Sequence, residues 1–176
     1  MAGTGPEDLQ ELCEEFLAAC IEALDSIPGS VPGLGGAPER RFISPGQSAD
    51  DCCPDQLTVW SNGLVPSPRS PGNFTGKSGT EGQIIAASLT ARIVRCLQQN
   101  EGEAPLPGLA QADAAQVNAD GFALWNHVFN LIRSGDLFML CGEVFWQGLR
   151  SVTSQGGCGG YQLNLLVEID GYQETT

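Results

Sequence analysis

Three segments of the chain alternate apolar and polar residues, and this period of two constrains the fold more than any other feature of the sequence. The clearest is Ile84 to Leu97, which predicts one long strand with an apolar side and a polar side. Glu143 to Ser154 and Tyr161 to Tyr172 alternate in the same way, and the glycine-rich connection 155–160 predicts an open hairpin tip between them. Gln56 to Trp60 adds a short strand candidate.

Two other segments repeat their apolar residues at helical spacing. Pro6 to Asp25 opens with a proline and several acids, which suits the positive end of a helix. Ala112 to Arg133 is the second helix, and it is expected to bury a face made of Val117, Gly121, Trp125, Val128, Phe129 and Ile132. The first helix also carries an acidic stripe, which is either a solvated face or a partner surface. Its Glu22 and Asp25 lie near the negative end of the helix dipole, a mismatch that hints at a basic partner.

The order of these elements predicts an α+β fold. Adjacent strands favour a mostly antiparallel sheet of about four to five strands, with two main helices packed on it. The 176 residues suit one domain. Residues 26–54 and 62–83 are rich in glycine and proline, and we interpret both as long loops that extend the domain rather than as linkers.

The charge of the chain excludes several classes of function. The net charge is -13, and a surface of this kind repels phosphate, so binding to the DNA backbone or through a polybasic membrane patch is not expected. The first residues carry acids and no Lys or Arg, whereas a secretory signal begins with positively charged residues. Apolar runs also fall short of the roughly 18 residues that span a bilayer.

The seven cysteines are expected to be reduced thiols, since their number is odd and no secretory signal is visible. Cys13 and Cys20 share one face of the first helix and are interpreted as small core residues. The adjacent Cys52 and Cys53 are interpreted as two thiols in preference to metal ligands or a disulfide. No C-x-x-C pair supports a zinc site.

No motif in the sequence fully matches a pattern for nucleotide binding or for catalysis by an activated nucleophile. Gly72 to Ser78 resembles a phosphate-binding loop, but it is one residue too short and does not follow a strand. The single histidine, His127, has no G-x-S-x-G nucleophile motif to serve. A hydrolase based on two carboxylates stays open, because acids are plentiful. We therefore predict no catalytic residues, no cofactor and no metal.

The remaining candidates are interface residues. Core packing explains Trp125 best, whereas Trp60 and Trp146 could face either the core or a partner. The full set of candidate interface residues is Glu11, Glu14, Glu22, Trp60, Phe74, Lys77 and Trp146.

The order of elements carries a resemblance to a known family. An amphipathic helix precedes a strand pair joined by a long loop, a second helix follows, and a hairpin closes the chain. This pattern resembles the tail terminator (tail completion) family of long-tailed, siphovirus-type phages. Cys52 to Val59 (CCPDQLTV) looks like sequences of this family from phages of actinobacteria.

The resemblance implies a structural virion protein rather than an enzyme. Members of the family form a homohexameric ring that caps the tail tube, stops its polymerisation and joins the tail to the head connector. The implied partners are other copies of the chain, the tail tube protein and the head–tail connector or stopper protein, and no membrane. Genomic DNA would pass through the lumen without specific binding. The location would be the head-proximal end of the virion tail, after assembly in the host cytoplasm. The alternatives are another neck or head-closure protein, the tail tube protein itself, or a small enzyme or ligand-binding module.

Overall fold

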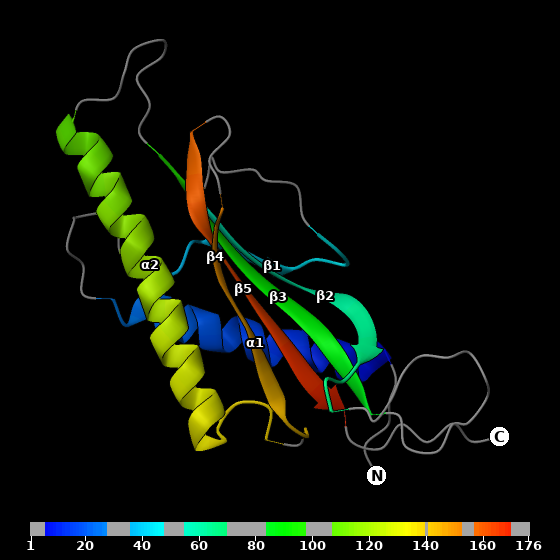
Figure 1. Ribbon diagram of the computed structural model, residues 1–176. Coiled ribbons are helices and arrows are strands. Elements are labelled where there is room, and N and C mark those ends of the chain that lie inside the picture. The colour runs from blue at the N-terminus through cyan, green and yellow to red at the C-terminus, as the bar shows by residue number, and fades with distance from the viewer. Residues whose placement is uncertain are drawn as a thin grey trace.

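The computed structural model describes residues 6–27, 36–47, 55–69, 84–97, 107–139, 141–152 and 157–169, and these form a five-stranded mixed sheet with two helices (Figure 1). The spatial order of the strands is β1-β2-β3-β5-β4; β1 runs parallel to β2, and the other neighbouring strands are antiparallel. The predicted α+β class is confirmed. In chain order the elements are α1 (Pro6–Asp25), β1 (Arg40–Ile43), β2 (Gln56–Pro66), β3 (Ile85–Cys96), α2 (Pro107–Ser134), β4 (Val144–Val152) and β5 (Cys158–Ile169).

Both helices lie against the same face of the sheet. Leu89 of β3 and Leu165 of β5 are paired across the ladder and fully buried, and they belong to one core cluster with Phe16 of α1 and Leu124 of α2. Alternate residues of each strand point to this face, as the period of two predicted. Burying one such side chain contributes about 1.5–3 kcal/mol, so the helices are fixed mainly by this shared core.

Gly121 of the second helix lies against the ring of Tyr161 of β5. A Cβ added there would lie 2.6 Å from the ring of Tyr161, so only glycine allows this approach. The hydroxyl of Tyr161 also donates a hydrogen bond to Oδ1 of Asn118, at 3.1 Å. A glycine inside a helix costs about 1 kcal/mol relative to alanine, and close packing on the sheet is the compensation here.

The structure corrects two boundaries of the sequence interpretation. Residues 26–54 were predicted as a loop, but β1 lies within them and pairs with β2. Four residues with two exposed arginines are too short to show a period of two, so the strand has no sequence signal. Residues 62–66 were also predicted as a loop, yet they continue β2 past an irregularity between Ser61 and Leu64, where Gly63 has a positive φ. The rest of that predicted loop lies outside the described residues from position 70 onward.

The cysteines divide into two groups. Cys13 and Cys20 are buried thiols on α1, as predicted, and burial raises the pKa of both. Cys96 and Cys158 are each disulfide-bonded, so the expectation of reduced thiols is wrong for these two. Cys96 of β3 lies opposite Cys158 of β5 in the register of the two strands. Cys52 and Cys53 lie outside the described residues.

Chemical reduction is expected to weaken the fold. A disulfide bond typically stabilises a protein by about 2–4 kcal/mol, so unfolding in urea should occur at a lower midpoint when dithiothreitol is present. A Cys141→Ser variant is the control, because Cys141 is not part of a disulfide bond and its substitution should leave the response to dithiothreitol unchanged. Equal midpoints for the oxidised and reduced wild type would contradict the expectation.

Candidate assembly interface

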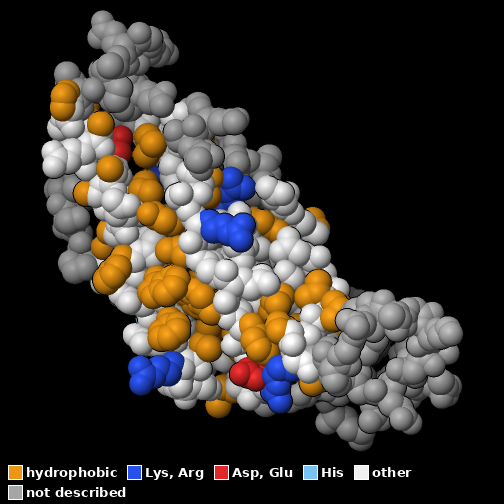
Figure 2. Space-filling model, viewed as in Figure 1, with side chains coloured by type: hydrophobic (Ala, Val, Ile, Leu, Met, Phe, Trp, Pro, Cys, Tyr) orange, Lys and Arg blue, Asp and Glu red, His pale blue; other side chains and the backbone are white. Residues whose placement is uncertain are grey.

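Four aromatic side chains gather where α2 passes the sheet edge formed by β4. They are Phe122, Trp125 and Phe129 of α2 and Trp146 of β4, and we call them the aromatic platform. The three residues of α2 are exposed, with Phe122 at 70%, Phe129 at 41% and Trp125 at 39%. Figure 2 shows apolar side chains gathered over the lower part of α2 and the neighbouring β4. Large apolar side chains grouped on a surface mark a site of interaction more often than scattered ones do.

Three rings of the platform, those of Trp125, Phe129 and Trp146, contact one another. Trp125 stacks on Phe129 with their centroids 6.4 Å apart, and Trp146 meets both rings edge-on, at 4.6 Å from Trp125 and 5.9 Å from Phe129. Such aromatic pairs contribute about 0.5–1.5 kcal/mol beyond the area that they bury. The platform is therefore a preformed surface and does not have to be ordered when a partner binds.

The spacing of apolar residues on α2 explains why they cannot all be buried. Leu124 and Val128 form the stripe that faces the core. Phe122, Trp125 and Phe129 recur at three and four residues on a second stripe, turned away from the core. The prediction that core packing explains Trp125 is wrong, because the helix has more apolar residues than one face can bury. This second stripe is the signal in the sequence that α2 has an exposed apolar face, although the sequence does not show which of the two stripes is the exposed one.

The platform lies beside an unpaired edge of the sheet. β4 ends the strand order, and β5 is its only neighbour among the described strands. Its ladder with β5 is interrupted between Trp146 and Gly148, and Gly148 has a φ of 120°. An irregularity of this kind twists an edge strand and makes simple strand addition less favourable. Contacts at this edge are therefore expected to be made chiefly through side chains.

The candidate interface residues from the sequence have different surroundings. Trp146 belongs to the platform, whereas the side chain of Trp60 is only 2% exposed and its indole donates to Oδ1 of Asn62 at 2.9 Å. Trp60 is thus unavailable to a partner in this structure. Glu11, Glu14 and Glu22 are exposed on α1, and Glu22 lies 3.5 Å from His127 of α2. Phe74 and Lys77 lie outside the described residues.

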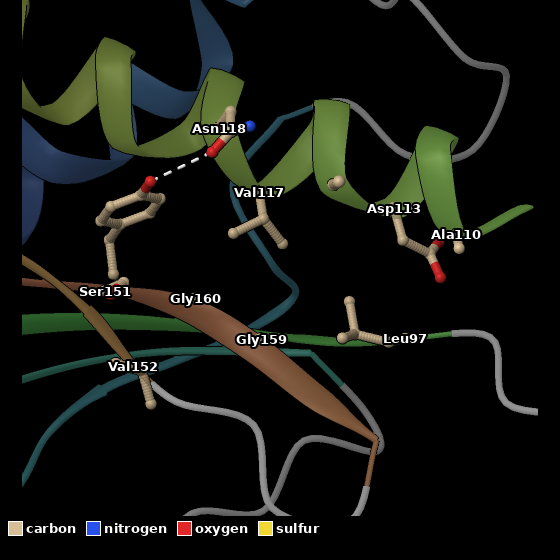
Figure 3. Close-up of a pocket in the computed structure, with 11 residues that line it drawn as sticks. Leu97, Ala110, Asp113, Val117, Asn118, Ser151, Val152, Gly159 and Gly160 are labelled. Atoms are coloured by element: carbon tan, nitrogen blue, oxygen red, sulfur yellow. Dashed lines mark hydrogen bonds between the residues drawn. The ribbon is translucent and has the colours of Figure 1, made fainter.

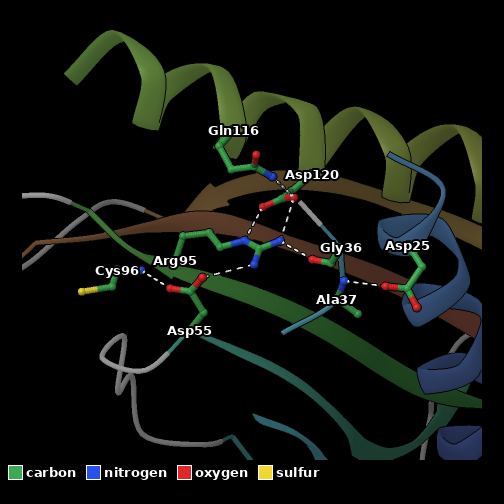
Figure 4. A network of polar contacts seen from close by, with 8 residues as sticks. All are labelled: Asp25, Gly36, Ala37, Asp55, Arg95, Cys96, Gln116 and Asp120. Atoms are coloured by element: carbon green, nitrogen blue, oxygen red, sulfur yellow. Dashed lines mark hydrogen bonds and ion pairs between the residues drawn. The ribbon is translucent and has the colours of Figure 1, made fainter. Parts of the chain in front are cut away.

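A buried ionic network joins α2 to β3, and its groups bond to one another rather than facing a ligand. Arg95 contacts both carboxylate oxygens of Asp120, at 2.8 and 3.0 Å, and Asp55 at 3.1 Å (Figure 4). Burial raises the pKa of Asp120, and the hydrogen bonds from Arg95 act in the opposite direction. Burial alone would lower the pKa of Arg95, but the two carboxylates outweigh it and raise that pKa. Gln116 and the carbonyl of Gly36 complete the network, so its groups are engaged with one another.

A second pair of carboxylates meets at Arg69, and it bears on the open hydrolase alternative. Glu143 and Glu168 both contact Arg69, at 2.8 and 3.5 Å. Glu168 is 2% exposed and accepts hydrogen bonds from the Ser67 hydroxyl and from the backbone N–H of Glu143. A carboxylate with so many internal partners has little capacity left for a substrate, so this cluster is a structural clamp between β2, β4 and β5.

A pocket of about 320 Å³ opens between the first half of α2 and the strands β4 and β5 (Figure 3). Leu97 and Val117 point into it, and Gly159 and Gly160 lie along its strand side. Asp113 and Asn118 bring polar groups, but Asn118 already accepts the hydrogen bond from Tyr161. Few polar groups converge, so the pocket specifies no class of ligand.

Other chemistry has little support among the described residues. They contain no group of three or more potential metal ligands, and neither helix is long and apolar enough to span a membrane. His127 is partly buried, and its Nε2 lies 3.5 Å from a carboxylate oxygen of Glu22, so it links the two helices. No protein-family model matches the chain, and no curated protein matches it.

Proposed function

We propose that this protein is a structural protein that assembles with copies of itself into a closed ring, and that it acts as a phage tail terminator. The aromatic platform is the observation that supports the proposal. Trp and Tyr side chains, together with Arg, dominate the binding energy of protein interfaces when they are grouped and desolvated. Here Trp125, Phe129 and Trp146 form one preformed group of rings, and the exposed Phe122 precedes Trp125 by three residues on α2.

The wider geometry is consistent with assembly rather than catalysis. The buried polar groups described above pair with one another, and the pocket lacks convergent polar groups. The resemblance of the element order to tail terminators supplies the particular assembly: a hexameric ring that ends the tail tube. A closed ring requires that one patch of a subunit meet a different patch of its neighbour after a fixed rotation. The negative charge of the chain, -13, suits a ring through which DNA slides without being held.

The oligomeric state is the direct test. The wild-type protein is expected to have a mass about six times that of the 18.5 kDa chain in light scattering and to form rings in electron micrographs. A variant with Phe122→Ser, Trp125→Ser and Phe129→Ser is expected to be a folded monomer. The matched control is Leu64→Ser with Met139→Ser, which removes exposed apolar side chains elsewhere and should keep the ring.

The alternatives give different results in the same measurements. Long cylinders instead of single rings would identify a tail tube protein. Phage particles that lack this protein are expected to have overlong tails if it is a terminator, and tails of normal length if it acts elsewhere in the neck. A wild-type protein that stays monomeric, alone and with tail tubes, would refute the proposal.

A further inference from the structure

The two helices present outward faces of opposite character. Between Leu9 and Asp25, the exposed residues of α1 carry four carboxylates and no basic group. The exposed residues of α2 carry one formal charge, that of Arg133, because both aspartates of this helix are buried. In a chain with a net charge of -13, a helix face without an exposed acid is unexpected. The acidic residues of the exposed face of α1 are Glu11, Glu14, Glu22 and Asp25.

Arg133 extends the stripe that carries the platform. It follows Phe129 by four residues, so it lies one turn further along the same side of α2. The platform therefore has an aromatic centre and a basic end. Figure 2 shows the same character: Lys and Arg side chains lie near the apolar patch, and few acidic side chains are visible on this face.

The outward face of α1 has the complementary pattern. Ala18 is exposed at its middle, and the partly buried Leu17 and Ile21 lie next to it. This small apolar area lies between Glu14 on one side and Glu22 on the other, each one helical turn away. An apolar centre with a charged rim is the usual anatomy of a protein interface. A flat aromatic group fits over an alanine, and a nearby arginine can pair with a carboxylate at the rim.

Within one chain both faces stay exposed, Ala18 on α1 and the three aromatic residues of the platform on α2, so neither covers the other. In Figure 1, α1 crosses behind the sheet and α2 runs along its side, and Glu22 at one end of the α1 face lies 3.5 Å from His127 of α2. Contact between them requires two copies, and the face that each copy uses differs from the face that its neighbour uses. Such a contact is heterologous, and repetition of it closes a ring when the rotation is suitable.

We infer that the aromatic platform of one copy, with Arg133 at its end, binds the outward face of α1 on the next copy. The inference rests on the proposed function, since it assigns the two surfaces that build the ring. It names Ala18 and the neighbouring carboxylates as the receiving surface, and a second copy of this chain as the occupant of the platform. Opposite charge at the rim orients the two copies, and burial of the aromatic side chains supplies most of the affinity.

The test uses two variants, one that disrupts the aromatic platform and one that disrupts the outward face of α1. Trp125→Asp with Phe129→Asp removes the platform and leaves α1 intact, whereas Ala18→Arg with Glu14→Lys removes the α1 face and leaves the platform intact. Each variant alone is expected to lose ring formation, with assembly weakened at least tenfold. Mixed in equal amounts, they retain one complete pair of surfaces and are expected to form a dimer of twice the 18.5 kDa chain.

Sedimentation velocity over a series of concentrations measures these masses, and circular dichroism checks that each variant is folded. Leu64→Arg is the control for added positive charge, because Leu64 is exposed on β2, and it should form the wild-type ring. If the wild type forms rings and the α1 variant does so equally well, or if the mixture stays monomeric, the inference is overturned and the ring proposal stands. If platforms instead bind each other, the α1 variant is expected to dimerise on its own, which also overturns the inference. A monomeric wild type refutes the proposed function itself.

Discussion

Replacement of Arg95 by methionine is expected to lower the free energy of unfolding by about 3–5 kcal/mol, because it leaves buried carboxylates without their partner. The side chain of Asp120 is 1% exposed and that of Arg95 is 7% exposed, so water cannot replace the lost contacts. Methionine preserves much of the side-chain volume, and the loss therefore reports the charge and its hydrogen bonds rather than a cavity. Urea unfolding monitored by tryptophan fluorescence measures the change.

The matched control is Arg150→Met on β4, where the arginine is exposed. An exposed charge contributes little to stability, so this variant should differ from the wild type by less than about 0.5 kcal/mol. Asp120→Asn with Arg95→Met should recover part of the loss, since neither partner then leaves an isolated charge in the core. Equal unfolding midpoints for Arg95→Met and Arg150→Met would show that the network contributes nothing to the fold.

Much of the fold could be predicted from the sequence because its long elements have strong periodicity. β3, β4 and α1 are close to their predicted ranges, whereas α2 begins five residues and β5 three residues earlier than predicted. β1 could not be predicted, since a four-residue strand depends on its pairing with β2 and not on its own pattern. The disulfide-bonded state of Cys96 and Cys158 was missed because the odd number of cysteines and the missing secretory signal favoured thiols.

The candidate interface was only partly predictable, for a different reason. Trp146 was a candidate on residue type, but the choice between core and surface for Trp125 depends on where α2 lies on the sheet. That position is set by Gly121 against Tyr161 and by Asp120 against Arg95, which are contacts between distant parts of the chain. These contacts turn Asp113, Gln116 and Asp120 inward, and the aromatic stripe is consequently turned outward. A helix with two apolar stripes gives no indication in its sequence of which one is buried.

The second large effect is expected at Gly160, where replacement by alanine should destabilise the protein by about 3 kcal/mol or more. Gly160 pairs with Val94 of β3 and with Val152 of β4, so its strand is enclosed on both sides. A Cβ built there would overlap the carbonyl oxygen of Ile93. That oxygen belongs to the backbone of a central strand and cannot move aside by a change of rotamer. β3 and β5 would have to separate, which breaks ladder hydrogen bonds and opens the core beneath them.

Gly108→Ala is the matched control, because nothing lies within 4 Å of a Cβ added at Gly108 and the residue is near the start of α2. Alanine favours a helix over glycine by up to about 1 kcal/mol, so this variant should be as stable as the wild type or slightly more so. Thermal unfolding distinguishes the two, with a lower midpoint expected for Gly160→Ala alone. If both variants unfold like the wild type, the close approach of β3 and β5 at Gly160 is not required for stability. If Gly160→Ala is unstable but still forms rings at low temperature, the strand contact serves the fold of the subunit and not the interface between subunits.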